Sequence, residues 1–290
     1  MGARRNHLPN LKNANTLQSN KPTPTARRAE NRVPETNASV VVSPAAATGI
    51  GIRNLVVRLG DQTVLSSLSL DVAAGEIVAL LGASGCGKST LLRAIARLVS
   101  PSAGEVTFSK PSRRAGDLSF VFQDATLLPW RTVAENVVLP LQLGNRGRDG
   151  SQAAVQSALA AVGLAERDYA KFPRELSGGM RMRTSIARAL VTDPSILLLD
   201  EPFAALDDIL RNRLNDLLLE LWQERQRTIL FVTHNIAEAI YLSHRIAIFG
   251  GGKIAEIVAN PLPWPRCAAH RSSPEFAAFF GHVSQQLAAA

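Results

Sequence analysis

The sequence predicts an α/β fold in which a mainly parallel sheet is flanked by helices, with an N-terminal antiparallel β subdomain and a helical subdomain. Three observations predict it. Short, fully apolar runs at 77–81 and 196–199 are typical of strands buried on both faces. Segments with helical periodicity alternate with such runs along the chain. A glycine-rich loop at 82–87 separates the first buried strand from the next helix.

The elements follow in a regular order. Two strands with alternating apolar and polar residues, at 51–59 and 63–72, come first and indicate an antiparallel pair. After a turn at 75–76 and the strand at 77–81, helices are predicted at 88–98, 152–162, 178–190, 208–224 and 236–243, and strands at 118–122, 196–199, 228–232 and 245–249. Glycines at 250–252 predict a hairpin turn. A final amphipathic helix aligns Phe276, Phe279, Phe280, Val283 and Leu287 on one face.

Composition and charge exclude several classes of protein. The 290 residues are 46% apolar and 19% charged, which suits a globular chain rather than a fibrous or fully disordered one. No apolar run approaches the roughly 20 residues of a membrane-spanning helix. Two cysteines, Cys86 and Cys267, are too few for a disulfide framework. Of the net charge of +8, residues 1–48 supply +5 from seven basic and two acidic residues, so the rest carries no strong nucleic-acid signature.

The loop at 82–89 matches the pattern G-x-x-x-x-G-K-[ST] between a buried strand and a helix. Glycines let such a loop curl so that successive N–H groups point at one phosphate, and the following helix adds its N-terminal partial charge. Lys88 then reaches the β- and γ-phosphates, and Ser89 binds Mg²⁺. The pattern predicts a P-loop NTPase fold. Its predicted nucleotide-binding residues are Gly82, Ala83, Ser84, Gly85, Cys86, Gly87, Lys88, Ser89 and Thr90.

A second motif is the apolar strand at 196–199, which leads into two carboxylates. We expect Asp200 to hold Mg²⁺, directly or through water, and Glu201 to polarise an attacking water. Many strands end in acidic residues, so this motif is only moderately specific by itself. Together with the phosphate loop it predicts metal-assisted phosphoryl transfer.

The segment 176–180 reads LSGGM and resembles the signature of the ATP-binding subunits of ABC transporters, which normally reads LSGGQ. Ser177 lies 24 residues before Glu201, the spacing that this family uses. Physically the signature is a second cluster of hydroxyl and glycine N–H groups at a helix start. The resemblance implies that Ser177, Gly178 and Gly179 face the γ-phosphate of ATP held by a second copy, in a head-to-tail homodimer.

Three further positions match the family in the same order. Gln123 matches the Q-loop glutamine, Asp207 matches the D-loop aspartate that acts across the dimer, and His234 matches the switch histidine that contacts the γ-phosphate. The resemblance covers about residues 50–257. It implies the catalytic residues Glu201, His234 and Gln123 and the Mg²⁺ ligands Ser89, Gln123 and Asp200.

The string LLPW at 127–130 is similar to the subfamily that imports nitrate, sulfonates, taurine and thiamine-precursor pyrimidines. Trp130 is open to two interpretations: core packing, or lining the groove that receives the coupling helix of a permease.

Leu59 stands where the family usually has an aromatic residue that stacks on adenine, so we expect weaker ATP affinity or an aliphatic adenine contact. Met180 replaces the usual Gln, and Asn235 the common Asp.

The predicted organisation has three parts. Residues 1–48 form a disordered basic tail. Residues 49–259 form an ABC ATPase domain, with its helical subdomain at about 124–190. Residues 260–290 form a short C-terminal extension with the amphipathic helix.

By resemblance, the chain is the ATP-hydrolysing subunit of an importer for a small solute, with ATP and Mg²⁺ as cofactors. It is expected to act peripherally at the cytoplasmic face of the inner membrane, with integral permease subunits and an extracytoplasmic solute-binding protein as partners. The alternative is a soluble ABC ATPase acting on nucleic acid or ribosomes, but neither a coiled-coil insertion nor tandem halves are visible. A scaffold without hydrolysis is opposed by the intact Lys88, Asp200, Glu201 and His234.

Overall fold

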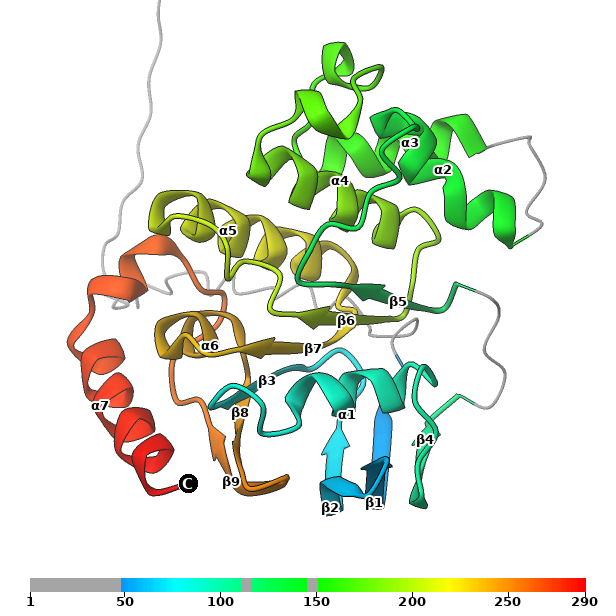
Figure 1. The fold of residues 1–290 in the computed structure, drawn as a ribbon. Coiled ribbons are helices and arrows are strands. Elements are labelled where there is room, and N and C mark those ends of the chain that lie inside the picture. The colour runs from blue at the N-terminus through cyan, green and yellow to red at the C-terminus, as the bar shows by residue number, and fades with distance from the viewer. Residues whose placement is uncertain (1–47, 111–115, 145–150) are drawn as a thin grey trace, which may run out of the picture. The chain divides into compact units, whose positions relative to one another are not determined.

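The computed structural model describes residues 48–110, 116–144 and 151–290, so residues 1–47 of the predicted tail lie outside the described residues. A six-stranded sheet runs through the described part (Figure 1). All its neighbouring strands pair in parallel except the last two, which are antiparallel. In spatial order the strands are β5 (Leu118–Val121), β6 (Ile196–Asp200), β7 (Thr228–Thr233), β3 (Ile77–Gly82), β8 (Arg245–Gly250) and β9 (Lys253–Ala259). The predicted mainly parallel sheet is confirmed.

A separate antiparallel sheet has the order β2-β1-β4. Its first two strands, β1 (Ile50–Leu59) and β2 (Gln62–Val72), confirm the predicted antiparallel pair. The third, β4 (Ala103–Phe108), was not predicted. Its six residues are all exposed or half-buried, so its sequence lacks the apolar run of a core strand. β4 forms because it pairs with β1, and the local sequence pattern does not predict this tertiary contact.

Side chains of β3 alternate between two hydrophobic cores. Ile77, Ala79 and Leu81 join the core shared with the helices numbered α2 to α7. Val78 and Leu80 join the core shared with the antiparallel sheet and with α1 (Lys88–Ile95). Because both faces are buried, the strand reads as an unbroken apolar run, which is why it was predictable.

The predicted end of helix α1 was wrong. The helix stops at Ile95 rather than at residue 98, because Arg97 adopts a left-handed backbone with φ of +60°. The N–H of Leu98 then donates to the carbonyl oxygen of Arg93 at 2.8 Å, which closes the helix. Leu98, the last residue of the predicted helix, is 58% exposed.

A group of helices follows β5 in the chain. It contains α2 (Val133–Leu143), α3 (Ser151–Ala161) and α4 (Gly178–Leu190), with short 3₁₀ turns η1 (Glu166–Asp168) and η2 (Pro173–Glu175). Helix α2 was not predicted, since Pro140 interrupts its pattern. The capping box Thr132/Glu135 was a usable signal: the Glu135 N–H donates to the Thr132 hydroxyl at 3.3 Å, and the Thr132 N–H donates to Glu135 Oε2 at 2.8 Å.

The last part of the chain packs against the sheet. It contains α5 (Asp208–Arg225), α6 (Ile236–Leu242), η3 (Ala268–Ser272) and α7 (Pro274–Ala289). Helix α7 buries Phe276, Phe279 and Val283, as predicted. Phe280, predicted on the same face, is 39% exposed because it lies at the edge of this stripe. No helix in the described ranges is both long and apolar enough to span a bilayer.

Residues beyond β9 hold the end of α6. The buried guanidinium of Arg266 donates to the carbonyl oxygens of Tyr241 and Ser243 at 3.1 and 2.8 Å. The Asn260 amide donates to the carbonyl of Ser243 at 2.9 Å. A guanidinium and an amide thus donate to carbonyl groups that have no partner within the helix. Positive charge is also stabilising at a helix C-terminus. The C-terminal segment therefore fixes the helix that follows β7.

Candidate functional site

The phosphate loop joins the buried end of β3 to the start of α1, as its pattern predicts. Gly87 is the N-cap of α1 and has a φ of +106°, so its left-handed backbone turns the loop into the helix. A Cβ at this position would lie 2.8 Å from a methyl carbon of Leu65. Glycine is therefore required by both conformation and space. No side chain caps the helix, which leaves its first N–H groups for a ligand.

Lys88 lies inside this loop and is almost fully buried. Its ammonium donates to the carbonyl oxygens of Gly82 and Ala83 at 2.9 and 2.7 Å. It also lies 3.6 Å from the thiol of Cys86. These contacts hold a positive charge beside the residues that were predicted to bind phosphate.

Ser89 and Asp200, predicted to share a metal, are brought together from α1 and the end of β6. The Ser89 hydroxyl donates to Asp200 Oδ1 at 2.6 Å. The guanidinium of Arg93 lies 3.8 Å from the other carboxylate oxygen. A hydroxyl and a carboxylate are the hard oxygen ligands that Mg²⁺ prefers, so the residues present fit this ion.

Glu201 and His234 also meet. Nδ1 of His234 lies 3.2 Å from Oε2 of Glu201, in a hydrogen bond that the imidazole donates. Their backbones are tied, because the Glu201 N–H donates to the carbonyl of Val232 at 3.1 Å. Glu201 has a φ of +46°, a strained conformation for a non-glycine residue, of the kind that concentrates at functional sites.

Gln123 follows β5 at the same edge of the sheet, because β5 pairs in parallel with β6. The side chain is exposed. Among the described residues it makes no hydrogen bond to Ser89 or Asp200. The structure therefore places Gln123 near this edge of the sheet but not in hydrogen-bond contact with the pair of Ser89 and Asp200.

The signature residues lie at the start of α4. Ser177 is the N-cap, and its hydroxyl accepts the Met180 N–H at 3.3 Å. Ser177 and Gly178 are exposed, whereas Gly179 packs so closely on α5 that an added Cβ would lie 2.5 Å from Leu210. None of the three bonds to the phosphate loop within the described residues.

Asp207 is likewise separate from the phosphate loop. Its carboxylate is exposed and accepts the Leu210 N–H at 2.9 Å, as the N-cap of α5. This capping role was not predicted, although Asp before a helical run is a standard start signal. The predicted sites thus divide into a phosphate-loop cluster and a signature surface.

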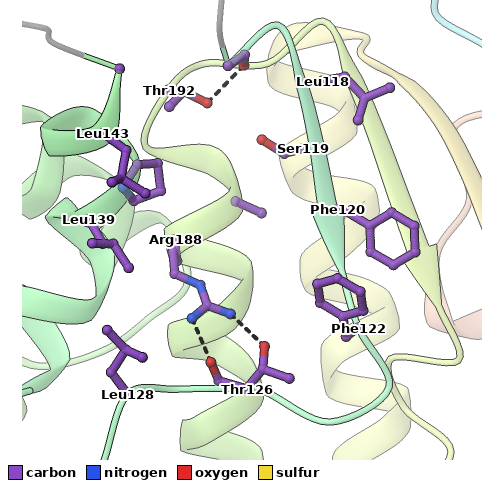
Figure 2. Close-up of a pocket in the computed structure, with 14 residues that line it drawn as sticks. Leu118, Ser119, Phe120, Phe122, Thr126, Leu128, Leu139, Leu143, Arg188 and Thr192 are labelled. Carbon is purple, nitrogen blue, oxygen red and sulfur yellow. Dashed lines mark hydrogen bonds between the residues drawn. The ribbon is translucent and has the colours of Figure 1, made fainter. Parts of the chain in front are cut away.

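Arg188 is a residue that the sequence reasoning missed. From α4, its guanidinium donates to the carbonyl oxygens of Ala125 and Thr126, both at 2.9 Å. It also donates to the Thr126 hydroxyl at 3.0 Å, and Figure 2 shows the two bonds to Thr126. Burial lowers the pKa of this guanidinium by penalising its charged form. Because these carbonyls follow Gln123 by two and three residues, Arg188 ties the signature helix to the predicted Q-loop. Only the fold reveals this, since the residues are far apart in sequence.

Two of the hydrophobic residues discussed from the sequence, Trp130 and Leu59, are exposed. Trp130 is 71% exposed, so the core-packing interpretation was wrong. Leu59, at the end of β1, is 51% exposed, which leaves its side chain open to a ligand.

Comparisons with known proteins agree with this geometry. The pattern of the family described as "ABC transporter" matches residues 65–204. The chain is 44% identical over 238 residues to the aliphatic sulfonates import ATP-binding protein SsuB 2 of Mesorhizobium japonicum, covering 82% of this chain and 89% of that protein. It is 45% identical over 234 residues to SsuB 2 of Rhizobium johnstonii, covering 81% and 89%.

A solved structure is also similar. The dimeric, post-hydrolysis structure of the ATP-binding cassette MJ0796 bound to ADP and Pi aligns with 31% identity and a TM-score of 0.65. The alignment covers 74% of this chain and all of that chain.

Proposed function

The chain belongs to the ABC transporter family, and from that premise we propose that it is the ATP-hydrolysing subunit of an importer for an aliphatic sulfonate or a chemically related small solute. The observation that carries this proposal is the double pairing beside the phosphate loop, Ser89 with Asp200 and His234 with Glu201. The similarity to two sulfonate-import subunits supports the solute class. Nitrate, taurine and thiamine-precursor-like solutes belong to the same proposal.

ATP binding follows from the loop and the helix behind it. The uncapped N–H groups of α1 and the ammonium of Lys88 stabilise the phosphates electrostatically. Ser89, Asp200 and Gln123 would hold Mg²⁺, which would neutralise charge on the β- and γ-phosphates when bound. Thr90 and the other loop residues would complete the phosphate contacts.

Glu201 is placed to act on the attacking water. Its carboxylate accepts from His234 through one oxygen, which leaves the second oxygen for a water proton. His234 in turn lies at the end of β7, where its exposed ring can reach the γ-phosphate. Gln123 would orient the same water from the end of β5.

The signature surface supports a homodimer. Ser177, Gly178 and Asp207 are exposed, and in the part of the chain that the structure describes they make no bond to the phosphate loop. Placed against a second copy, they would complete its ATP site. The similar cassette of known structure is a dimer bound to ADP and Pi.

A permease would dock near the helical group. An apolar cavity of about 600 Å³ lies between β5 and α2, with Leu118, Phe120, Phe122, Leu128, Leu139 and Leu143 in its lining (Figure 2). Exposed Trp130 and Leu143 lie at either end of the segment that leads into and forms α2. We infer a peripheral position at the cytoplasmic face of the inner membrane, with a solute-binding protein outside. The nucleic-acid alternative gains no support.

The experiment that tests this function is the Glu201→Gln variant. It keeps the shape of the side chain but removes the carboxylate, so ATP should bind, remain unhydrolysed and trap a dimer measurable by light scattering. Wild-type protein with ATP should release phosphate and return to monomer. A monomeric Glu201→Gln protein with ATP bound would contradict the composite site, and sulfonate uptake unchanged after deletion of this chain would contradict the transport role.

A further inference from the structure

A carboxyl group lies buried behind the turn that presents His234. Glu238, on α6, is 5% exposed. Its Oε2 accepts a short hydrogen bond from the hydroxyl of Thr233, the last residue of β7. Its Oε1 is buried and has no hydrogen-bond partner among the described residues. A half-satisfied buried carboxyl is costly, so it calls for a functional reason.

The Thr233 hydroxyl joins this carboxyl to the backbone around His234. It accepts the Asn235 N–H at 3.0 Å while it donates to Glu238. The Asn235 side chain in turn accepts the Glu238 N–H at 3.1 Å. A hydroxyl has a single proton, and an ionised carboxylate is only an acceptor. The carboxylate therefore fixes the direction of the hydroxyl and leaves its oxygen free for the Asn235 N–H.

Hydrogen bonds rather than packing hold the turn on this side. A polar cavity of about 340 Å³ borders it and is lined by Asn235 and Glu238 together with residues of α5 and η3. If the link from Thr233 to Glu238 were lost, the side-chain contacts of the turn on this side would be reduced to the cap that Asn235 provides for α6. His234 would then leave its place beside Glu201.

Burial of the Glu238 carboxyl makes the link to Thr233 sensitive to pH. Burial raises the pKa of Glu238 to about 7, against the opposing effects of the Thr233 hydroxyl, Arg211 and His234. Arg211 does not pair with this carboxyl, since it donates to Asp208 and to the carbonyl of Leu206. The titratable or charged groups that face Glu238 are Asp208 and Arg211 on α5, Glu201 after β6, His234 in the turn, Tyr241 on α6 and Arg271 in η3.

We propose that Glu238 is a positioning residue for ATP hydrolysis, whose carboxylate fixes Thr233 and, through it, the turn that presents His234 to the γ-phosphate. This rests on the proposed role of His234 in hydrolysis. When the carboxyl is protonated it keeps an acceptor oxygen, but it loses its charge, so the hydrogen bond from the Thr233 hydroxyl weakens. The turn loosens, so kcat falls as pH drops through the pKa of Glu238.

The test compares kcat and KM for ATP in matched variants of the full chain. Thr233→Val removes the bridging hydroxyl and should lower kcat about 10- to 100-fold, with KM nearly unchanged, because the reacting groups are misplaced rather than lost. Thr233→Ser keeps the hydroxyl and should retain activity. Glu238→Ala should resemble Thr233→Val, and the double variant should be no worse than either.

The pH profile separates positioning from a merely structural role. Glu238→Gln still accepts from Thr233 but cannot titrate, so the fall of kcat between pH 8 and 6 should flatten. Asp168→Asn, which changes another buried acid far along the chain from this turn, should keep the wild-type profile. If Thr233→Val fails to fold, the pH profile of kcat for Glu238→Gln tests the role of Glu238 by itself.

The outcomes are distinguishable. Wild-type protein that does not hydrolyse ATP would overturn the proposed function itself. Active wild-type protein, with Thr233→Val and Glu238→Gln unchanged in kcat and pH profile, would overturn only the role of Glu238.

Discussion

The phosphate-loop side and the signature side of the nucleotide site differ in how far one chain completes them. Lys88, Ser89 and Asp200 are tied by hydrogen bonds within the chain and lie mostly buried at the sheet edge. Ser177 and Asp207 are exposed, and each caps the helix that it begins. One half is preorganised by the sheet, and the other is an exposed surface that we propose gains a ligand only against a second copy of the chain. The predictions below test this division, from the largest expected effect to the smallest.

Removing the charge of the preorganised half should have the largest effect. Lys88→Ala should lower ATP hydrolysis by at least about 100-fold, because the buried cation that we propose binds the phosphates is lost. Phosphate release measures this. Lys171→Ala is the matched control, since Lys171 pairs with Asp168 among the helices and should leave hydrolysis unchanged. Wild-type hydrolysis by Lys88→Ala would refute the phosphate site.

Blocking the signature surface should lower ATP hydrolysis nearly as much, but mixing with a second variant should restore it. Ser177→Arg should reduce hydrolysis about 100-fold, since a bulky side chain would cover the surface that we propose faces the partner's phosphate. ATP binding to the single chain should persist. Mixing this variant with Lys88→Ala should restore hydrolysis, because mixed dimers contain one site with both intact halves.

The control for this experiment is Ser177→Ala, which loses the helix cap, at about 1 kcal/mol of stability, and one hydroxyl, but adds neither bulk nor charge to the surface. It should dimerise and hydrolyse ATP far better than Ser177→Arg. If the mixture stayed inactive, each chain would have to work alone, and the division into two halves would be wrong.

The link between the two halves should show a smaller effect, on stability. Arg188→Ala removes the donors to a half-buried and an exposed carbonyl and should lower the free energy of unfolding by about 1–3 kcal/mol, measured in urea. ATP affinity of the single chain should change little. Arg188→Lys keeps the charge but not the forked geometry, so an intermediate loss is expected. An unchanged free energy of unfolding in Arg188→Ala would refute the claim that Arg188 holds the segment after Gln123 to α4.

The smallest expected effect is at the adenine side. Leu59→Tyr should tighten ATP binding by about 0.5–1.5 kcal/mol through stacking, a 2- to 10-fold change by titration calorimetry. Tripolyphosphate, which lacks the base, should bind both proteins equally. Leu98→Tyr alters another exposed leucine after α1 and should change nothing. A gain in Leu98→Tyr equal to that in Leu59→Tyr would argue against an adenine contact.

The local sequence pattern was enough to predict an element where its residues are both buried in a regular pattern and adjacent to a recognisable motif. The strand β3 is buried on both faces, so its apolar run was readable, and Gly87 and Lys88 follow it in a fixed pattern. Helix α4 was predicted with its observed bounds because its cap and periodicity agree. Strand β4 and helix α2 were not, since one is an exposed edge and the other contains Pro140.

The sequence by itself determined the α/β fold, the phosphate loop and the residues that belong to the predicted site, because these depend on local backbone needs and on short spacings. Only the tertiary structure decided that Ser89 meets Asp200, that Arg188 holds the segment after Gln123, and that Glu238 lies behind His234. These contacts join positions brought together by parallel strand pairing and helix packing. The free energy that forms them comes from burying two cores rather than from any local pattern.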